Sequence, residues 1–202
     1  MEIINYCIFK TAWGYFGLLA NDKGLIKTSL PADTYESAKN NLLNTDSAQL
    51  SLRVPSRTRQ SQSFKLIESP SIFPDLQKAI IDYYNGIYVD FNNLEIPFDF
   101  TTLTDFSKKV LLACKSLNIG QTITYAGLAA LAGSPRAARA AGSVMAANQW
   151  PLLIGCHRII RADGIIGNFS GPGGTATKKR MLAHEQAIIN KGVRNDSHKE
   201  NR

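Results

Sequence analysis

Two short helical segments joined by a tight turn constrain the fold of this chain more than any other part of its sequence. Thr124 can cap a first helix that ends at Gly133. Ser134 can cap a second helix over 135–147, with Pro135 in the favoured first position. This order is typical of the helix-turn-helix, although many helical hairpins bind nothing. We therefore predict a mainly helical second half that contains this motif.

The predicted second helix has two distinct faces. Ala138, Ala141 and Met145 form a stripe that would pack inward. The opposite face combines cations with very small side chains: Arg136, Arg139, Ala140 and Ser143. Small side chains let a helix approach a partner closely, and arginine binds phosphates and bases. A DNA-binding helix and an Ala-rich core helix with two solvated arginines both fit this pattern.

The net charge of +7 is unevenly distributed. Residues 1–97 hold 9 Lys and Arg against 10 Asp and Glu, whereas residues 98–202 hold 14 against 6. This asymmetry favours nucleic acid as the partner of the second half, with a basic solubility surface as the alternative. No apolar run approaches the roughly 20 residues of a membrane span, and no signal peptide is evident. We expect an intracellular protein without a membrane partner, cytoplasmic in a bacterium and nuclear in a eukaryote.

The first half has the pattern of mixed α and β structure. Short β-prone runs over 3–10, 15–20 and 25–28 are separated by turn residues, which predicts an antiparallel meander. The other elements expected here are a helix over 34–43, a surface loop over 45–63, a helix over 74–84 and a strand after Asn85-Gly86.

A domain boundary is expected near residue 97, where the pattern becomes helical. Residues 1–97 would form a scaffold without catalytic groups, and residues 98–188 would carry the function. Thr104 can cap the first helix of this second domain, and Gly120 can end it. Residues 189–202 are polar and charged, which predicts a disordered tail.

The three cysteines include no CxxC pair, which excludes a disulfide framework and a thiolate zinc site. Cys7 and Cys114 lie in apolar patterns and are expected in the core. Cys156 lies in Gly155-Cys156-His157-Arg158, between apolar β-prone runs at 152–154 and 159–160. A cysteine beside a base and a cation can form the nucleophilic thiolate, but a buried cysteine preceding a histidine by chance also fits.

The segment around Cys156 resembles the Pro-Cys-His-Arg-Val/Ile signature of the O6-alkylguanine-DNA alkyltransferases, the methylated-DNA–protein-cysteine methyltransferases. Further motifs of that family occur in its order: Thr124-Tyr125, Ala137-Ala138-Arg139-Ala140, Asn148, Gly167-Asn168-Phe169-Ser170-Gly171 and Leu182-Ala183-His184-Glu185. The resemblance implies an α+β fold. In it, a small N-terminal α/β domain with a ribonuclease-H-like sheet precedes a mainly helical domain with a winged-helix-like helix-turn-helix.

The resemblance also implies a single-turnover enzyme that repairs double-stranded DNA. It would flip O6-alkylguanine, or O4-alkylthymine, out through the minor groove and move the alkyl group to Cys156. His157 would act as a base through water, oriented by Glu185, and Tyr125 would rotate the nucleotide and protonate the leaving purine. Arg139 would fill the vacated space in the stack. The resemblance implies no cofactor or metal, and a monomer.

The guanine pocket implied by the resemblance comes from the loops around the cysteine. Asn148 would order the hinge before the cysteine loop, and Pro151 would line the alkyl pocket. Ser170 would hold the guanine oxygen, between Phe169 and Gly171.

Two positions depart from the family pattern. Gly155 replaces the usual proline, which removes a constraint on φ, and Phe169 stands where tyrosine is frequent. Both departures allow a reduced rate. Two other functions fit parts of the sequence. One is a helix-turn-helix damage sensor or regulator with weak or no transfer activity. The other is a cysteine hydrolase, for which the sequence shows no oxyanion site.

Overall fold

The computed structural model describes residues 2–43 and 64–197, and the side chains up to residue 192. The chain divides into two compact units. The first unit combines Met1–Ile81 with Glu95–Thr104, and the second combines Asp82–Leu94 with Asp105–Arg202. The predicted boundary at residue 97 thus falls within a segment of the first unit, and a segment before it belongs to the second. The loop expected over 45–63 lies outside the described residues.

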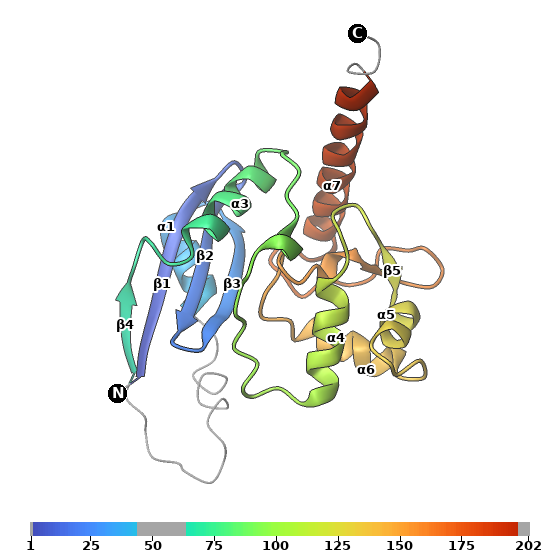
Figure 1. The fold of residues 1–202 in the computed structure, drawn as a ribbon, viewed down its shortest axis with the longest axis horizontal. Helices are drawn as coiled ribbons and strands as arrows, with labels where there is room; N and C mark the ends of the chain where they lie inside the picture. The colour runs from blue at the N-terminus through green and yellow to red at the C-terminus, as the bar shows by residue number, and fades with distance from the viewer. Residues whose placement is uncertain (1, 44–63, 198–202) are drawn as a thin grey trace. The chain divides into compact units, whose positions relative to one another are not determined.

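A four-stranded sheet forms the centre of the first unit (Figure 1). Strands β1 (Glu2–Thr11), β2 (Gly14–Asn21) and β3 (Gly24–Ala32) form the predicted antiparallel meander. Strand β4 (Phe64–Glu68) pairs with β1 in parallel, so the order is β3-β2-β1-β4. The sequence did not predict β4, because its mostly exposed residues lack a buried apolar alternation.

Two predicted helices are confirmed in this half of the chain. Helix α1 (Tyr35–Leu43) places Leu42 in a core cluster with Ile4, Tyr6, Leu19 and Ile26 from the sheet. Helix α3 (Pro74–Tyr84) begins in the first unit and ends in the second.

The strand expected after Asn85-Gly86 does not form. A short 3-10 helix, η1 (Phe91–Asn93), occurs there instead. Its cause is local, because the Asp90 carboxylate accepts a hydrogen bond from the backbone N–H of Asn92.

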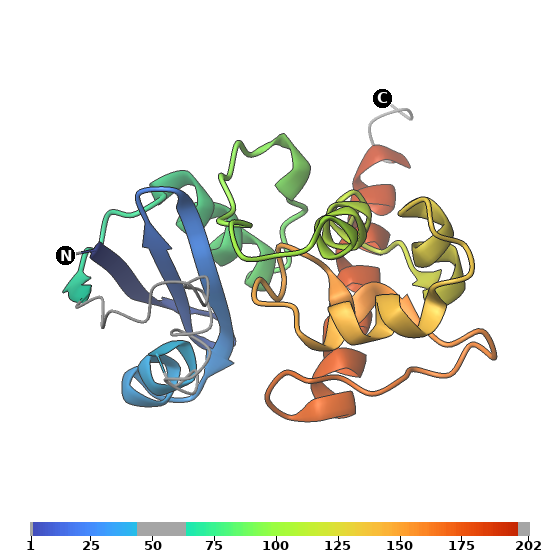
Figure 2. The ribbon, with the colours of Figure 1, turned by 90° about the horizontal axis from the view of Figure 1, so that it is seen from below.

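The second unit is mainly helical, as predicted. Its elements are α4 (Asp105–Lys115), β5 (Ile123–Thr124), α5 (Tyr125–Leu131), α6 (Ala138–Ala146), η2 (Cys156–Arg158), β6 (Ile159–Ile160) and α7 (Gly174–Ser197). Strands β5 and β6 pair in parallel, so the start of α5 lies beside the end of β6. Helices α5 and α6 pack against each other (Figure 2). Helix α4 ends at Lys115, before the predicted Gly120: the Ser116 hydroxyl donates to the Ala113 carbonyl, and the N–H of Leu117 bonds to the Cys114 carbonyl instead of continuing the α-helical pattern.

The turn of the helix-turn-helix differs from the prediction at one helix start. Thr124 caps α5 as expected, and Gly133 ends it with a left-handed φ of 76°. The N–H groups of Gly133 and Ser134 bond back to Ala130 and Ala129, a Schellman motif. Ser134 therefore belongs to the end of α5, and its carbonyl accepts from Ala137.

Helix α6 consequently begins at Ala138 instead of residue 135, and Arg136 lies in the turn before it. The two predicted faces of α6 are nevertheless present. Ala141 and Met145 are buried. Ala138, the third residue of the predicted inward stripe, is only partly buried. The opposite face of α6 is exposed at Arg139, Ala140 and Ser143, and Arg136 is exposed in the turn before it.

Helix α7 extends beyond the expected start of the tail at residue 189. Ile188 is buried, and the helix continues to Ser197 because each further residue of an existing helix adds a hydrogen bond. Residues 198–202 lie outside the described part of the chain. None of the helices in the described ranges is both long and apolar enough to cross a bilayer.

Candidate active site

A tight loop connects α6 to the short helix that carries Cys156. The sequence predicts a β-prone run over 152–154, but the structure forms turns there. Leu152 has a φ of 78°, rare for a bulky side chain, and is fully buried. Asn148 fastens this loop at two points: its Oδ1 accepts from the N–H of Trp150 at 3.0 Å, and its Nδ2 donates to the carbonyl of Ile154 at 2.9 Å. Asn148 thus ties the end of α6 to the residues preceding the cysteine.

Gly155 occupies an inverse γ-turn directly before the nucleophile candidate. Its φ is −70° and its ψ is 59°. The N–H of Cys156 donates to the carbonyl of Ile154 at 2.7 Å, closing the turn. A φ of −70° is open to any L-residue and lies in the range of proline. The backbone at residue 155 therefore does not require glycine.

Cys156 opens helix η2, and only 8% of its surface is exposed. Burial raises the pKa of its thiol, although a hydrogen bond from Asn148 and the positive charge of Lys178 act in the opposite direction. The thiol in the free protein is accordingly protonated, and it needs a base to become a nucleophile. Cys7 and Cys114 are also buried, and burial raises the pKa of each, as expected of core cysteines.

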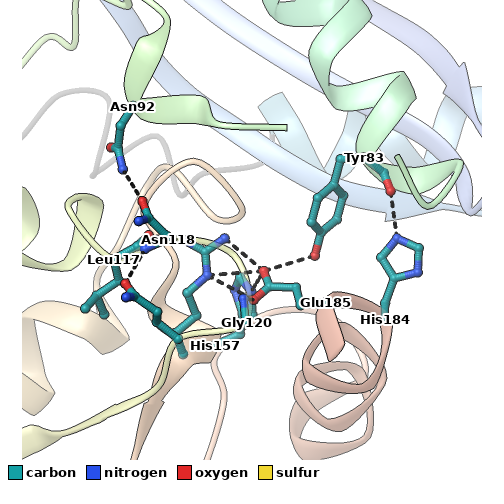
Figure 3. A network of polar contacts seen from close by, with 10 residues as sticks. Tyr83, Asn92, Leu117, Asn118, Gly120, His157, His184 and Glu185 are labelled. Carbon is teal, nitrogen blue, oxygen red and sulfur yellow. Dashed lines mark hydrogen bonds and ion pairs between the residues drawn. The ribbon is translucent and has the colours of Figure 1, made fainter. Parts of the chain in front are cut away.

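The next residue in the sequence is His157, whose buried imidazole makes a hydrogen bond through only one of its two ring nitrogens within the described residues. Nε2 of His157 lies 2.7 Å from Oε1 of Glu185 (Figure 3). Nδ1 is buried and has no hydrogen-bond partner among the described residues. Burial lowers the pKa of His157, so the imidazole is neutral, with its proton on Nε2 facing the carboxylate. Nδ1 is then the nitrogen that can accept a proton.

Glu185 is the centre of the polar network in Figure 3. Besides His157, its carboxylate accepts from Nη2 of Arg158 at 2.8 Å, the N–H of Gly120 at 2.9 Å and the hydroxyl of Tyr83 at 3.3 Å. Burial alone would raise the pKa of Glu185, but the hydrogen bonds and charges of His157 and Arg158 outweigh it and hold the pKa well below its usual range. The carboxylate is thus ionised and held in place.

Two buried residues of this region were not identified from the sequence. The first is Lys178, a fully buried lysine whose Nζ donates to the carbonyl of Ile159 at 2.5 Å. Burial lowers its pKa, and its charge acts on Cys156. The sequence did contain a signal that Lys178 is buried: its spacing places it on one face of α7 with Met181, Glu185 and Ile188.

The second is Tyr83, which lies in the half expected to be a scaffold only. It is the residue before the last of α3 and is fully buried in the second unit. His184 approaches it as well: Nε2 of His184 lies 2.7 Å from the Tyr83 carbonyl. A residue 102 positions from Glu185 gives no local sequence signal, so only the fold reveals it.

Tyr125 lies at the start of α5, immediately after the Thr124 cap. It is half-buried, and burial together with the Cys156 thiol raises its pKa. Its ring lies close to both α6 and the segment after β6, since a Cβ added at Gly142 or Gly167 would meet it at 3.6 Å or 3.8 Å. Tyr125 thus lies against α6 and near enough to Cys156 for the thiol to affect its pKa.

The remaining predicted pocket residues lie on both sides of Cys156 in the sequence. Pro151 is partly buried in the loop before it. Phe169 and Gly171 are partly buried and Ser170 is exposed, all between β6 and α7. As far as the structure describes the chain, these last three residues make no hydrogen bond to Cys156 or its network. No cluster of metal-ligating side chains occurs in the described ranges either.

Comparison with known proteins identifies relatives of the second unit. Residues 105–187 match the family model of the 6-O-methylguanine DNA methyltransferase DNA-binding domain. The chain is 52% identical over 81 residues to a methylated-DNA–protein-cysteine methyltransferase of Mus musculus, which covers 40% of this chain and 38% of that protein. The match thus spans about two fifths of each protein.

The likeness to solved structures extends further but shows the fold alone. The crystal structure of Mycobacterium tuberculosis O6-methylguanine methyltransferase superposes with a TM-score of 0.64 at 21% identity, over 92% of this chain and 94% of that one. The structure of Mycobacterium tuberculosis OGT in complex with DNA gives a TM-score of 0.64 at 20% identity, over 91% and 94%. Both units therefore have counterparts in these proteins.

Proposed function

Because residues 105–187 match the family model of the 6-O-methylguanine DNA methyltransferase DNA-binding domain, we propose that this chain is a methylated-DNA–protein-cysteine methyltransferase, which repairs double-stranded DNA by moving the alkyl group of O6-alkylguanine onto Cys156. One observation carries this proposal. A protonated, buried thiol lies beside a neutral imidazole whose Nδ1 has no partner among the described residues and whose Nε2 is held by an ionised carboxylate. This arrangement supports the assignment of Cys156 as nucleophile, His157 as base and Glu185 as orienting group of a transfer reaction.

The transfer is a displacement at the alkyl carbon. His157 Nδ1 accepts the thiol proton through a water molecule, and Glu185 stabilises the resulting imidazolium. The thiolate forms an S–C bond as the C–O6 bond breaks. The guanine leaves with the electron pair and takes a proton from the Tyr125 hydroxyl, which is restored by exchange with solvent. The thioether product is a poor leaving group, so each molecule reacts once.

Access to the alkyl group requires the base to leave the stack. Helix α6 offers an exposed face of small residues that can approach the minor groove. Arg139 is exposed on this face and would fill the space of the extruded nucleotide, while Arg136 and Ser143 contact phosphates and Ala140 allows close approach. Tyr125, which lies against α6 and near Cys156, would crowd the target phosphate.

The pocket for the extruded base would form around Cys156. Pro151 would line the alkyl group, and Phe169, Ser170 and Gly171 would contact the guanine. Asn148 is proposed to hold the cysteine loop in a fixed position relative to α6. Its hydrogen bonds to Trp150 and Ile154 of that loop favour this role. O4-alkylthymine is a second substrate with the same displacement chemistry.

Four finer assignments belong to the same proposal. The sheet of the first unit is taken as ribonuclease-H-like and the helix-turn-helix as winged-helix-like. The chain acts as a monomer, because nucleophile, base and exposed helix all lie in one unit. It works where genomic DNA is found, the cytoplasm of a bacterium or the nucleus of a eukaryote. The reaction as written needs no cofactor.

Intact mass spectrometry tests the proposal. The protein is incubated with duplex DNA that contains one O6-methylguanine, and the expected result is a mass gain of one methylene unit that peptide mapping places on Cys156. Matched duplex with guanine is the control and should give no gain. Tight binding to the alkylated duplex without any gain would support a damage sensor instead, and a gain on another residue would refute the assigned nucleophile.

A further inference from the structure

Tyr83 contacts α7 through both its backbone and its side chain (Figure 3). Its carbonyl lies 2.7 Å from Nε2 of His184, and because a carbonyl only accepts, that nitrogen donates. Its hydroxyl donates to Oε1 of Glu185, the next residue of α7, at 3.3 Å. The rings of Tyr83 and His184 also meet edge to face, with centroids 5.1 Å apart. Two neighbouring residues of α7 thus fix the direction in which the Tyr83 hydroxyl points.

The hydroxyl of Tyr83 shares its acceptor with the proposed base. Within the described ranges, Oε1 of Glu185 accepts from three side chains: Nε2 of His157 at 2.7 Å, Nη2 of Arg158 at 2.8 Å and the Tyr83 hydroxyl at 3.3 Å. Nε of Arg158 lies between the two carboxylate oxygens, and Oε2 also accepts from the N–H of Gly120. Because a carboxylate oxygen has about two lone pairs, the donors on Oε1 compete for it.

We propose that Tyr83 is a positioning residue for alkyl transfer: by donating to Oε1 of Glu185, it weakens the hold of that oxygen on the imidazole of His157 and so keeps His157 free to accept the thiol proton. The inference rests on the proposed function, since His157 is assigned there as the base. Tyr83 touches no reacting atom and acts through Glu185. The segment Asp82–Leu94 thereby contributes to the functional network of the second unit.

The alternative role for Tyr83 is that of an ordinary core tyrosine. Its ring packs against Tyr84 and Phe91, with centroids 5.0 Å and 5.9 Å apart. In that role, removing the hydroxyl lowers the stability of the protein and leaves the protonation of His157 as it is. The two roles therefore differ in one measurable quantity, the pH at which His157 takes up a proton.

The direction of the effect follows from the groups around the pair of His157 and Glu185. Glu185 favours a proton on His157, whereas burial and the charges of Arg158 and Lys178 disfavour it. Without the Tyr83 hydroxyl, Oε1 binds the protonated imidazole more strongly, so the pKa of His157 rises towards its ordinary value. The base is then lost at a higher pH than in the native protein.

The other titratable groups near this pair keep their side chains in the test. They are His184 and Arg180 from α7, the Cys156 thiol from η2, Cys114 from α4, Tyr125 from α5 and Tyr84 from α3. Burial raises the pKa of Tyr83 itself, so its hydroxyl stays a neutral donor. A change in the protonation of His157 can accordingly be assigned to the lost hydroxyl.

The test is the substitution Tyr83→Phe, with Tyr88→Phe as the matched control. Tyr88 lies in the same segment and is 51% exposed. Single-turnover rates of methyl transfer are measured across pH. We expect the acid limb of the profile to move to higher pH by about half a unit in Tyr83→Phe, which is about a threefold change in proton affinity, and to stay in place in the control. An unmoved acid limb in folded Tyr83→Phe overturns the proposal, even if the rate falls at every pH.

A second variant alters the hydroxyl without removing it. 3-Fluorotyrosine in place of Tyr83 keeps the hydrogen bond, and its more acidic phenol donates more strongly to an ionised acceptor. The acid limb should then move to lower pH, opposite to its movement in Tyr83→Phe. Movement to higher pH, or none, in the fluorinated protein overturns the proposal. Because this variant retains the hydroxyl, it decides the matter if Tyr83→Phe does not fold.

The free protein provides a measurement that needs no substrate. The Nε2 proton of His157 faces Oε1 of Glu185, and a stronger hydrogen bond moves its NMR resonance downfield. We expect a downfield shift in Tyr83→Phe, an upfield shift in the fluorinated protein and none in Tyr88→Phe. If the wild-type protein transfers no alkyl group, the proposed function fails, while this resonance still shows whether Tyr83 controls the pair. The same resonance position in wild type and Tyr83→Phe overturns the proposal.

Discussion

The hydroxyl of Tyr83 donates to Oε1 of Glu185 at 3.3 Å, and both side chains are fully buried. The same carboxylate oxygen faces Nε2 of His157, so the hydroxyl and the imidazole share one acceptor. A tyrosine from the N-terminal half of the sequence thus contacts the group that orients the proposed base.

Tyr83→Phe removes this hydroxyl while keeping the ring. We expect a loss of about 1 to 2 kcal/mol in the free energy of unfolding, because a buried hydrogen bond to a charged group is lost. Tyr88→Phe is the control, since Tyr88 is 51% exposed. Urea denaturation of both variants measures the difference. Equal stabilities of the two variants would show that the Tyr83 hydroxyl adds nothing to the network.

Cys156→Ala should abolish alkyl transfer and leave binding to alkylated duplex nearly unchanged. The thiol supplies the nucleophile, whereas contacts to DNA come from other side chains. Mass spectrometry and a binding titration measure the two properties separately. Cys114→Ala is the control, because Cys114 is a core residue and should retain transfer. Residual transfer in Cys156→Ala would place the nucleophile elsewhere.

Arg139→Ala should slow repair of duplex DNA at least about tenfold more than reaction with free O6-benzylguanine, if the pocket admits that base. Extrusion of a base from the duplex costs a few kcal/mol, and the free base needs none. Arg139 is exposed, so its loss should not alter the fold. Parallel rate measurements on both substrates decide the point. An equal reduction on both would mean that Arg139 acts on the pocket and not on extrusion.

The stability of the protein should fall in acid in two steps. His157 and Glu185 both have lowered pKa values in the folded protein, so the unfolded chain binds more protons as pH decreases. The His157 contribution is lost below about pH 6.5 and the Glu185 contribution below about pH 4.5. Urea denaturation at a series of pH values measures the slope. Glu185→Gln should flatten the second step, and an unchanged profile in that variant would contradict the assignment.

Thr124→Ala should cost about 1 kcal/mol of stability, because Oγ1 of Thr124 accepts the backbone N–H of Gly127 at 3.0 Å and caps α5. Thr122→Ala, at an exposed position just before β5, is the matched control. Thermal melting of both variants gives the comparison. If the two variants melt together, the cap contributes little, and the position of Tyr125 does not depend on it.

Local sequence signals predicted the parts of this fold that local interactions determine. Helix α3 has the predicted bounds, Thr124 caps α5, and the buried stripe of α6 occurs where its spacing indicates. The start of α6 was wrong because the Ser134 carbonyl accepts from Ala137, three residues on, which closes a tight turn where the first turn of the helix was expected. Where the end of one helix and the start of the next compete for the same residue, neither local pattern alone shows which of them forms.

The candidate site shows the same limit. Residues 156 and 157 are adjacent in the sequence, and the resemblance pointed to Glu185, which the structure places against His157. The catalytic roles of these three residues stay predictions. Lys178 was overlooked because buried lysines are rare, although its helical spacing placed it beside Glu185.

The segment Asp82–Leu94 belongs to the second unit, although Glu95–Thr104 after it returns to the first. The second unit is therefore built from two separate segments of the sequence. A fragment that starts at the first residue of α4 lacks Tyr83 and with it one of the donors to Glu185. A fragment that starts at residue 82 contains the whole second unit, but it also carries residues 95–104, which belong to the first unit and would lose the partners they have there.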